Sequence, residues 1–252
     1  MGQRKDNRRK RGFVPASLDK IAPWGRSLAE YIRMFDLTEA NLGLHILDCA
    51  AGPASFNAEM HGRGHAVISC DPIYAFSAAE IARRIKQARA AIRKSTEAHR
   101  DNFVWTEYGS IESLARIRMA AMKQFLADLP LGLDEGRYRT SELPALPFRD
   151  LEFDLALCSH FLFTYSDALP LEFHLGAIRE MCRVASEARI FPLLPSFGTA
   201  RSPHAELIIR QLSAEGYRCE IRRVPYEFQR GGNETLCVHR DGGRREPGAE
   251  RP

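Results

Sequence analysis

The feature that most constrains the fold is an alternation of short apolar runs with longer segments of helical periodicity. The strand-like runs are 44–48, 66–70, 103–105, 153–158, 189–191, 217–224 and 234–239. The helical segments are 25–36, a short helix ending near 62–64, 76–98, 111–128, 167–185 and 203–215. Strands separated by helices predict a doubly wound α/β fold, in which helices cover both faces of a mostly parallel sheet. Because no helix separates the last two runs, we expect them to pair antiparallel.

The charge of the chain is concentrated at its start. The net charge is +4, and residues 1–12 alone carry +5, from six Lys or Arg residues and one Asp. The rest of the chain therefore carries −1, the difference between these two values. We expect residues 1–12 and 241–252 to be disordered tails and 13–240 to form one domain, with a helical insertion at about 109–142.

Composition excludes several classes of protein. Hydrophobic residues make up 44% and charged residues 27%, which is ordinary for a globular domain. No apolar run approaches the roughly 20 residues that span a bilayer, and no apolar segment of a secretion signal follows the basic start. The six cysteines are scattered without a CxxC pair, which predicts packed thiols and neither disulfides nor a metal site. We expect a cytoplasmic protein that does not contact a membrane.

Acidic residues end the first two strand-like runs, where ligands bind in folds of this kind. Asp48 ends the first run and precedes a turn of small residues, 50–54. A carboxylate there would repel the pyrophosphate of a dinucleotide, and GxGxxG is missing, so a NAD-dependent enzyme is disfavoured. The ammonium and sulfonium groups of S-adenosyl-L-methionine suit this acid better. Asp71 ends the second run and can accept hydrogen bonds from ribose hydroxyls, while Pro72 offers an apolar surface to adenine.

Four segments in this order resemble the class I methyltransferases that use S-adenosylmethionine. They are 46–52 (ILDCAAG), 69–72 (SCDP), 146–160 (LPFRDLEFDLALCSH) and 180–184 (EMCRV). The resemblance covers roughly residues 20–240. It implies a Rossmann-like sheet of seven strands with an antiparallel last strand, S-adenosylmethionine as cofactor and methyl transfer as the activity. The family's turn is usually DxGxGxG, whereas Ala50 and Ala54 here replace two of its glycines, which costs little only if φ stays negative.

The resemblance also implies roles for residues outside the strand ends. Glu142, or Ser141 beside it, would meet the adenine amino group, and Arg26 would pair with the methionyl carboxylate. Trp24 or Tyr31 would pack on the sulfonium. His160 is a candidate general base. The predicted cofactor-binding residues are Arg26, Asp48, Ala50, Gly52, Asp71, Pro72, Glu142 and Ser159.

The acceptor of the methyl group is indicated only in outline. The segment at residues 159–163, which follows the fourth strand-like run, is largely apolar, and this favours a small-molecule acceptor. One alternative is an RNA methyltransferase, in which the basic tail and a basic flank of the helix at 76–98 hold phosphates. Another is a binding protein without catalytic activity on the same scaffold, suggested by Ala50 and Ala54.

Overall fold

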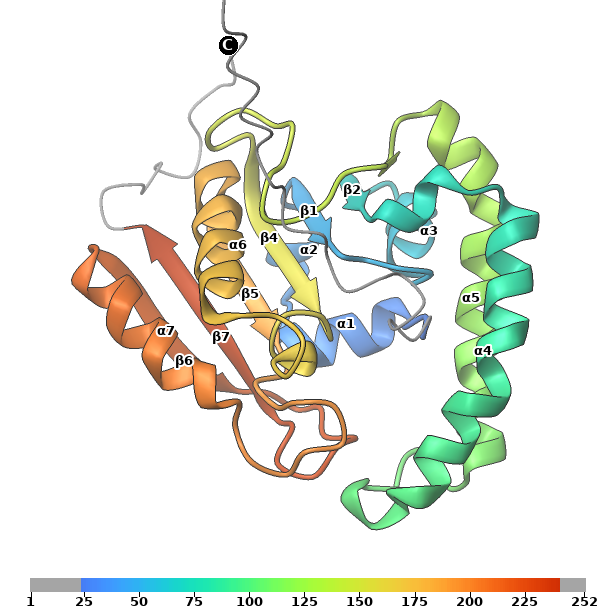
Figure 1. The fold of residues 1–252 in the computed structure, drawn as a ribbon. Helices are drawn as coiled ribbons and strands as arrows, with labels where there is room; N and C mark the ends of the chain where they lie inside the picture. Colours follow the sequence, from blue (N-terminus) through green and yellow to red (C-terminus); the bar gives the residue numbers. More distant parts are fainter. Residues whose placement is uncertain (1–23, 241–252) are drawn as a thin grey trace, which may run out of the picture.

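A seven-stranded sheet organises the protein, and the computed structural model describes residues 24–240 of it (Figure 1). The predicted tails, 1–12 and 241–252, lie outside the described residues. The strands are β1 (Ile46–Cys49), β2 (Val67–Cys70), β3 (Tyr138–Arg139), β4 (Phe153–Ser159), β5 (Ala185–Phe191), β6 (Tyr217–Arg223) and β7 (Glu234–Arg240). Their order is β3-β2-β1-β4-β5-β7-β6, and β7 runs antiparallel to both of its neighbours. This architecture confirms the predicted fold class.

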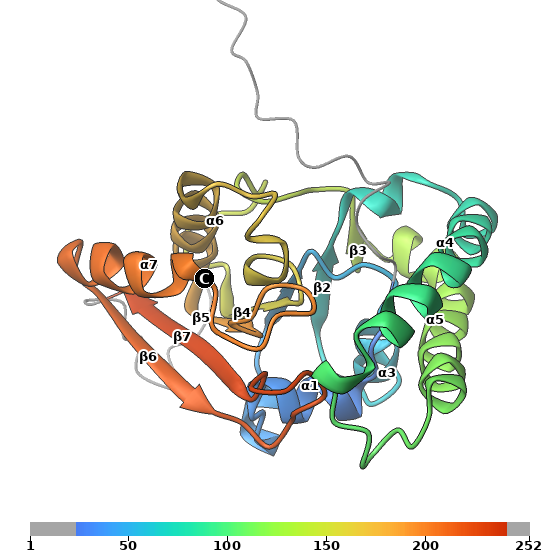
Figure 2. The same cartoon turned by 60° about the horizontal axis from the view of Figure 1, so that its bottom comes forward.

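Helices cover both faces of the sheet, because neighbouring side chains on each strand point to opposite sides. Leu47 packs in the cluster formed with α6 (Leu171–Val184) and α7 (Pro203–Ala214). Ile46 packs in the cluster on the other face of the sheet. The helices of this second face are α1 (Leu28–Phe35), α2 (Glu39–Leu42) and α3 (Phe56–His61), and α1 and α3 lie across the sheet from α6 and α7 (Figures 1 and 2).

Two long helices stand beside the β3 edge of the sheet as an antiparallel pair (Figure 1). They are α4 (Ala78–Ala98) and α5 (Ile111–Asp134), and short 3-10 turns, η2 (Pro72–Ala75) and η3 (Arg100–Asn102), flank α4. Another 3-10 turn, η4 (Phe163–Tyr165), follows β4. Part of the pair contacts the core, since Ile81 and Ile85 of α4 and Phe125 of α5 are buried together with Tyr74.

The prediction of a third strand at residues 103–105 is wrong. Phe103 forms only an isolated antiparallel bridge with Gln229, and its ring stacks on that of Phe228 at 4.6 Å. These large side chains favour a strand, but they pack in an aromatic cluster and the backbone does not pair with a strand of the sheet. The third strand is β3, which pairs parallel with β2 and lies within the segment predicted as an insertion. Two residues are too few to give a periodic signal.

The helix predicted at 111–128 continues further than expected, to the end of α5 at Asp134, and contains Pro130. The segment around Gly132 lies beyond the end of the predicted helix. It stays helical because Leu129 is buried and because Gly132 lies against Tyr138, whose ring a Cβ at Gly132 would approach to 2.4 Å. Tertiary packing here overrides the local helix-breaking signal of proline and glycine.

Five cysteines are buried and Cys219 is half-buried, which confirms the prediction that the cysteines are packed side chains.

Within residues 24–240, no helix is both long enough and apolar enough to cross a bilayer.

Candidate active site

The turn between β1 and α3, residues 50–54, is anchored from two directions, and we call it the cofactor loop because the sequence predicts the cofactor there. The Asp71 carboxylate at the end of β2 accepts a hydrogen bond of 2.9 Å from the Gly52 amide. The hydroxyl of Tyr74 in η2 donates to the Gly52 carbonyl at 2.8 Å. Both polar backbone groups of Gly52 are therefore held by side chains that follow the second strand. Nothing in the sequence around Tyr74 signals this role.

Two residues of the cofactor loop have left-handed backbone conformations. Gly52 has a φ of 55° and Ala50 a φ of 52°. Glycine adopts this region freely, whereas a Cβ at Ala50 makes it unfavourable. Alanine costs little where φ is negative. This holds at Ala54, whose φ is not in the left-handed region, and does not hold at Ala50. The loop stores a small amount of strain at Ala50.

Asp71 lies half-buried at the same end of the sheet as the cofactor loop. Its second oxygen accepts a hydrogen bond of 2.8 Å from the Ile73 amide. Burial raises the pKa of Asp71 to about 6, in spite of these two backbone hydrogen bonds, and the charge of Glu142 adds to the rise. Pro72 and Ile73 are also half-buried, and Glu142 is exposed. The structure therefore brings Asp71, Pro72 and Glu142 together around the loop.

Asp48 lies beneath the cofactor loop and is only 1% exposed. The Tyr31 hydroxyl donates to its two oxygens at 3.2 and 3.3 Å, and the Ser69 hydroxyl lies 3.5 Å away. Burial raises the pKa of Asp48 well above its ordinary value. Tyr31 is itself a core side chain, whose ring stacks on Phe56 at 4.3 Å. The sequence predicts Asp48 at the cofactor and Trp24 or Tyr31 on the sulfonium, whereas the structure pairs Tyr31 with Asp48.

Arg26 is buried next to the cofactor loop and has no carboxylate partner among residues 24–240. Its Nη1 donates to the Trp24 carbonyl at 3.2 Å, its Nε has no hydrogen-bond partner, and no ion pair joins it to another described residue. Burial lowers its pKa, and the neighbouring charge of Arg118 lowers it further. The segment is pressed against the loop, because a Cβ at Gly25 would lie 2.2 Å from the Pro53 carbonyl oxygen. Arg26 thus keeps unused capacity to bind an anion.

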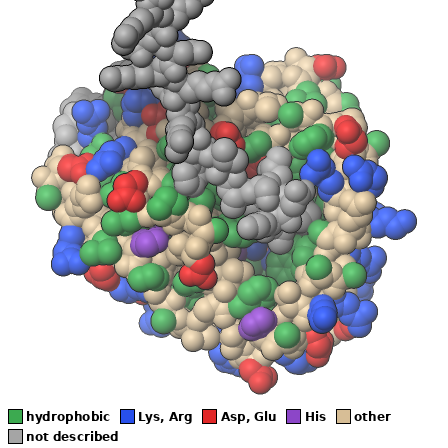
Figure 3. Space-filling model, viewed as in Figure 1, with side chains coloured by type: hydrophobic (Ala, Val, Ile, Leu, Met, Phe, Trp, Pro, Cys, Tyr) green, Lys and Arg blue, Asp and Glu red, His purple; other side chains and the backbone are tan. Residues whose placement is uncertain are grey.

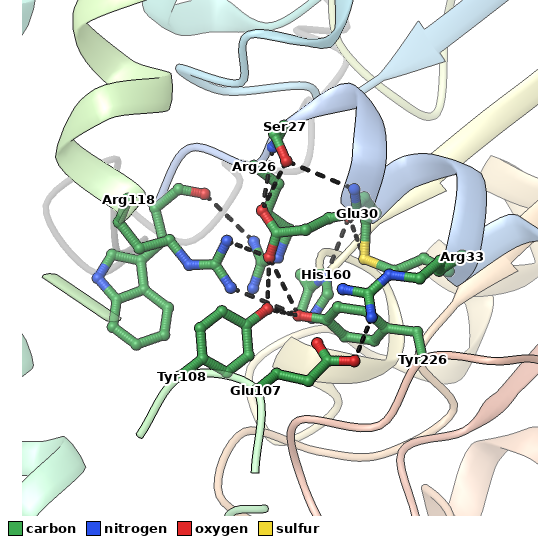
Figure 4. Close-up of polar contacts among 12 residues, drawn as sticks. Arg26, Ser27, Glu30, Arg33, Glu107, Tyr108, Arg118, His160 and Tyr226 are labelled. Atoms are coloured by element: carbon green, nitrogen blue, oxygen red, sulfur yellow. Dashed lines mark hydrogen bonds and ion pairs between the residues drawn. The ribbon is translucent and has the colours of Figure 1, made fainter. Parts of the chain in front are cut away.

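A cluster of buried polar side chains surrounds Glu30 of α1 (Figure 4). Glu30 forms an ion pair with Arg118 of α5 and accepts hydrogen bonds from Tyr108 at 2.7 Å and Tyr226 at 3.3 Å. Burial opposes the charge of Glu30, but Arg118 outweighs burial and lowers the pKa of Glu30 to about 2. With Arg26 included, the cluster has two guanidiniums and one carboxylate. Its members come from three distant stretches of the chain, 26–30, 108–118 and 226, so no local pattern could reveal it.

His160, the candidate base, lies just beyond β4 and close to Arg26 (Figure 4). Its backbone has a φ of 52°, and its amide donates to the Phe191 carbonyl at 2.6 Å. Its Nδ1 is 2.9 Å from the hydroxyl of Ser159, which is buried. Burial lowers the pKa of His160 well below its ordinary value, and the charges of Arg26 and Arg118 add to this. The imidazole is therefore neutral and holds an added proton poorly.

Comparison with known proteins identifies one relative of nearly the same length. The chain is 34% identical to the uncharacterized protein MJ0045 of Methanocaldococcus jannaschii over 217 residues, which are 86% of this chain and 95% of that protein. No protein-family model matches the chain.

Solved structures with a similar arrangement have much lower sequence identity. One is magnesium protoporphyrin IX methyltransferase of Synechocystis PCC 6803, determined with S-adenosylmethionine bound. It is 16% identical, with a TM-score of 0.40, over 81% of this chain and 73% of that chain. Another is an S-adenosylmethionine-dependent methyltransferase of Aquifex aeolicus. It is 16% identical, with a TM-score of 0.40, over 83% of this chain and 91% of that chain.

Proposed function

We propose that this chain, which belongs to the same protein family as MJ0045, is an S-adenosylmethionine-dependent methyltransferase that acts on a small molecule. The observation that carries the proposal is the cofactor loop itself. It follows β1, an interior strand of the sheet between β2 and β4, is anchored to Asp71 at the end of β2, and lies against the segment that holds Arg26. Ligands of doubly wound sheets bind at this edge, beyond the carboxyl ends of the strands.

The polar groups around the loop fit the parts of this cofactor. The unpaired Arg26 guanidinium would bind the methionyl carboxylate, which would also offset the excess positive charge of the cluster. The Asp71 carboxylate would accept hydrogen bonds from the ribose hydroxyls. Pro72 and Ile73 would cover the adenine ring, and Glu142 would accept from its amino group. The backbone of Ser159 would close the site from the β4 side.

Two buried residues and the half-buried His160 would position the reacting groups. When bound, S-adenosylmethionine supplies a methyl group already activated by its sulfonium. The chain then has to hold the acceptor in line with that methyl group and to exclude water. Asp48 and Tyr31 support the loop from below through their hydrogen bond. His160 stays neutral and orients the acceptor by hydrogen bonding. It is poorly suited to general-base catalysis, because its protonated form is disfavoured.

Calorimetry with S-adenosylmethionine and S-adenosylhomocysteine tests the proposal. We expect the wild type to bind both, and Asp71→Ala to bind at least about tenfold more weakly, which corresponds to roughly 1.4 kcal/mol of lost hydrogen bonding. Asp167→Ala, at an exposed aspartate of the η4–α6 connection, is the control and should bind as the wild type does. No binding by the wild type would reject the proposal. Binding without methyl transfer to broad acceptor pools would favour a non-catalytic binding protein.

A further inference from the structure

A groove of about 490 Å³ lies between α4 and α5, and Trp24 forms part of its wall. Its surface is largely apolar and includes Ile85 and Ile92 of α4 and Leu114 and Met122 of α5. The volume is within the range of small-molecule sites, which are about 300–1,000 Å³. The groove can therefore accommodate an aliphatic group of one small molecule.

Positive charges line the same groove. Lys86, Arg89 and Arg93 project from α4 and Arg118 from α5, whereas Glu112 is the one acid among the lining residues. Lysine and arginine side chains gather along the edge of the molecule formed by these helices, at the right of Figure 3. Arg93 pairs with Glu112 at 3.1 Å. Across residues 24–240, Lys86 and Arg89 have no ion pair, so their charges remain available to an anion.

The groove adjoins the candidate active site. Met122 lines the groove, and its Cγ would lie 2.6 Å from a Cβ at Gly25, the residue that packs on Pro53 of the cofactor loop. Arg118 lines the groove and ion-pairs with Glu30 in the buried cluster. A molecule in the groove would thus lie beside the residues proposed to hold the cofactor.

We propose that this groove binds the methyl acceptor and that the acceptor is a single-chain amphipathic anion. The identification as an acceptor rests on the proposed methyltransferase function. The aliphatic chain lies along the apolar floor, and the phosphate or carboxylate group binds Lys86 and Arg89. The same cations were predicted to hold RNA phosphates. The floor is aliphatic except for Trp24, however, and single-stranded RNA is bound on several aromatic platforms.

Isothermal titration of the full chain with dodecyl phosphate, below its micellar concentration, tests this inference. Lys86 and Lys94 are matched exposed lysines on α4, and only Lys86 lines the groove. We expect Lys86→Glu to weaken binding at least tenfold and Lys94→Glu to change it less than twofold. Dodecyltrimethylammonium should bind at least tenfold more weakly than dodecyl phosphate. Ala115→Phe, which narrows the groove, should weaken dodecyl phosphate binding while leaving the far-ultraviolet circular dichroism unchanged.

Three results would overturn the inference. They are no binding of dodecyl phosphate by the wild type, equal effects of the two lysine variants, and equal binding of the cationic detergent. Binding of decauridylate that depends on Lys86, without binding of dodecyl phosphate, would assign the groove to RNA and also overturn it. S-adenosylmethionine is titrated into the same samples. Cofactor binding without dodecyl phosphate binding rejects only the groove. Dodecyl phosphate binding without cofactor binding rejects the proposed function, and with it the identification of the ligand as a methyl acceptor, but leaves the groove as a site for an amphipathic anion.

Discussion

The Asp71 carboxylate accepts a hydrogen bond of 2.9 Å from the amide of Gly52, 19 residues earlier in the chain. This contact ties the end of β2 to the turn that follows β1. The other oxygen accepts from the Ile73 amide, so the orientation of the carboxylate is set by two backbone donors before any ligand binds. Each oxygen still has a lone pair for a ligand hydroxyl. Asp71 is thus both an anchor of the cofactor loop and a proposed ligand of the ribose.

Cofactor affinity should depend on pH through Asp71. Because the pKa of Asp71 is raised to about 6, its ionised fraction falls from about 0.9 at pH 7 to about 0.1 at pH 5. We expect the affinity for S-adenosylmethionine to fall about tenfold over this range, as measured by calorimetry. Asp71→Asn should bind weakly at both values and show no such dependence. An equal affinity of the wild type at pH 5 and pH 7 would contradict the assignment.

The raised pKa of Asp71 has the opposite consequence for folding. The folded state binds the Asp71 proton more tightly than the unfolded chain does. This contribution to stability is therefore fully present below about pH 4 and is lost as pH rises through about 6. Urea unfolding of the wild type and of Asp71→Asn should differ in pH dependence within that window and run parallel above pH 7.

Glu30→Gln should be strongly destabilising. It leaves the Arg118 guanidinium buried without its carboxylate, a change that typically costs about 3–5 kcal/mol. Urea unfolding at pH 7 measures the effect. Glu234→Gln, which breaks the exposed pair with Arg201, is the control and should cost less than about 1 kcal/mol. Adding Arg118→Met to Glu30→Gln should recover part of the stability, and a further loss would contradict the account.

Low pH should remove the stability that the ionised Glu30 carboxylate gives to the folded protein. Because the folded pKa of Glu30 is lowered to about 2, its ionisation stabilises the protein above the ordinary value of 4.5, and this stability is lost as pH falls toward 2. A lowering of this size corresponds to about 3 kcal/mol. Glu30→Gln should therefore lose less stability than the wild type between pH 5 and pH 3. Parallel pH profiles of the two proteins would refute this.

Glycine substitutions at the two loop alanines should have opposite effects. Ala50 has a left-handed φ of 52°, so Ala50→Gly relieves strain and should stabilise the protein by up to about 1 kcal/mol, after the greater entropy loss of glycine. Ala54 is buried and its φ is not left-handed, so Ala54→Gly should destabilise the protein by about 1 kcal/mol. Thermal and urea unfolding measure both variants. The same sign for the two would show that Ala50 is not strained.

Gly25→Ala should displace the cofactor loop. Its Cβ would lie 2.2 Å from the Pro53 carbonyl oxygen, a contact with backbone that cannot move aside easily. We expect a loss of about 1–3 kcal/mol in stability and at least tenfold in affinity for S-adenosylmethionine. Gly43→Ala is the control, because its nearest neighbour, the Ala40 carbonyl oxygen, would be 3.6 Å away. A Gly25→Ala protein that binds the cofactor as the wild type does would contradict the close approach.

Much of the sheet could be predicted because its signals are local. Runs such as 153–158 show the hydrophobicity of a buried strand, and the absence of a helix between β6 and β7 implies their antiparallel pairing. The errors fall where packing overrides propensity. The run at 103–105 joins an aromatic cluster, and the two-residue β3 was missed because only its neighbour β2 makes it a strand.

Apart from the third strand, the sequence by itself determined the order of strands and helices, and it placed small residues after the first strand and Asp71 after the second. Only the tertiary structure decided which polar groups become partners. It hydrogen-bonds Asp48 to Tyr31, pairs Glu30 with Arg118 and, within the part of the chain that the structure describes, leaves Arg26 without a carboxylate. The physical reason is that hydrophobic periodicity and connection length can be read from residues close in the chain. The desolvation of a buried polar group depends instead on which distant residues folding places beside it. Glu30 and Tyr226 share a hydrogen bond across 196 positions of the chain.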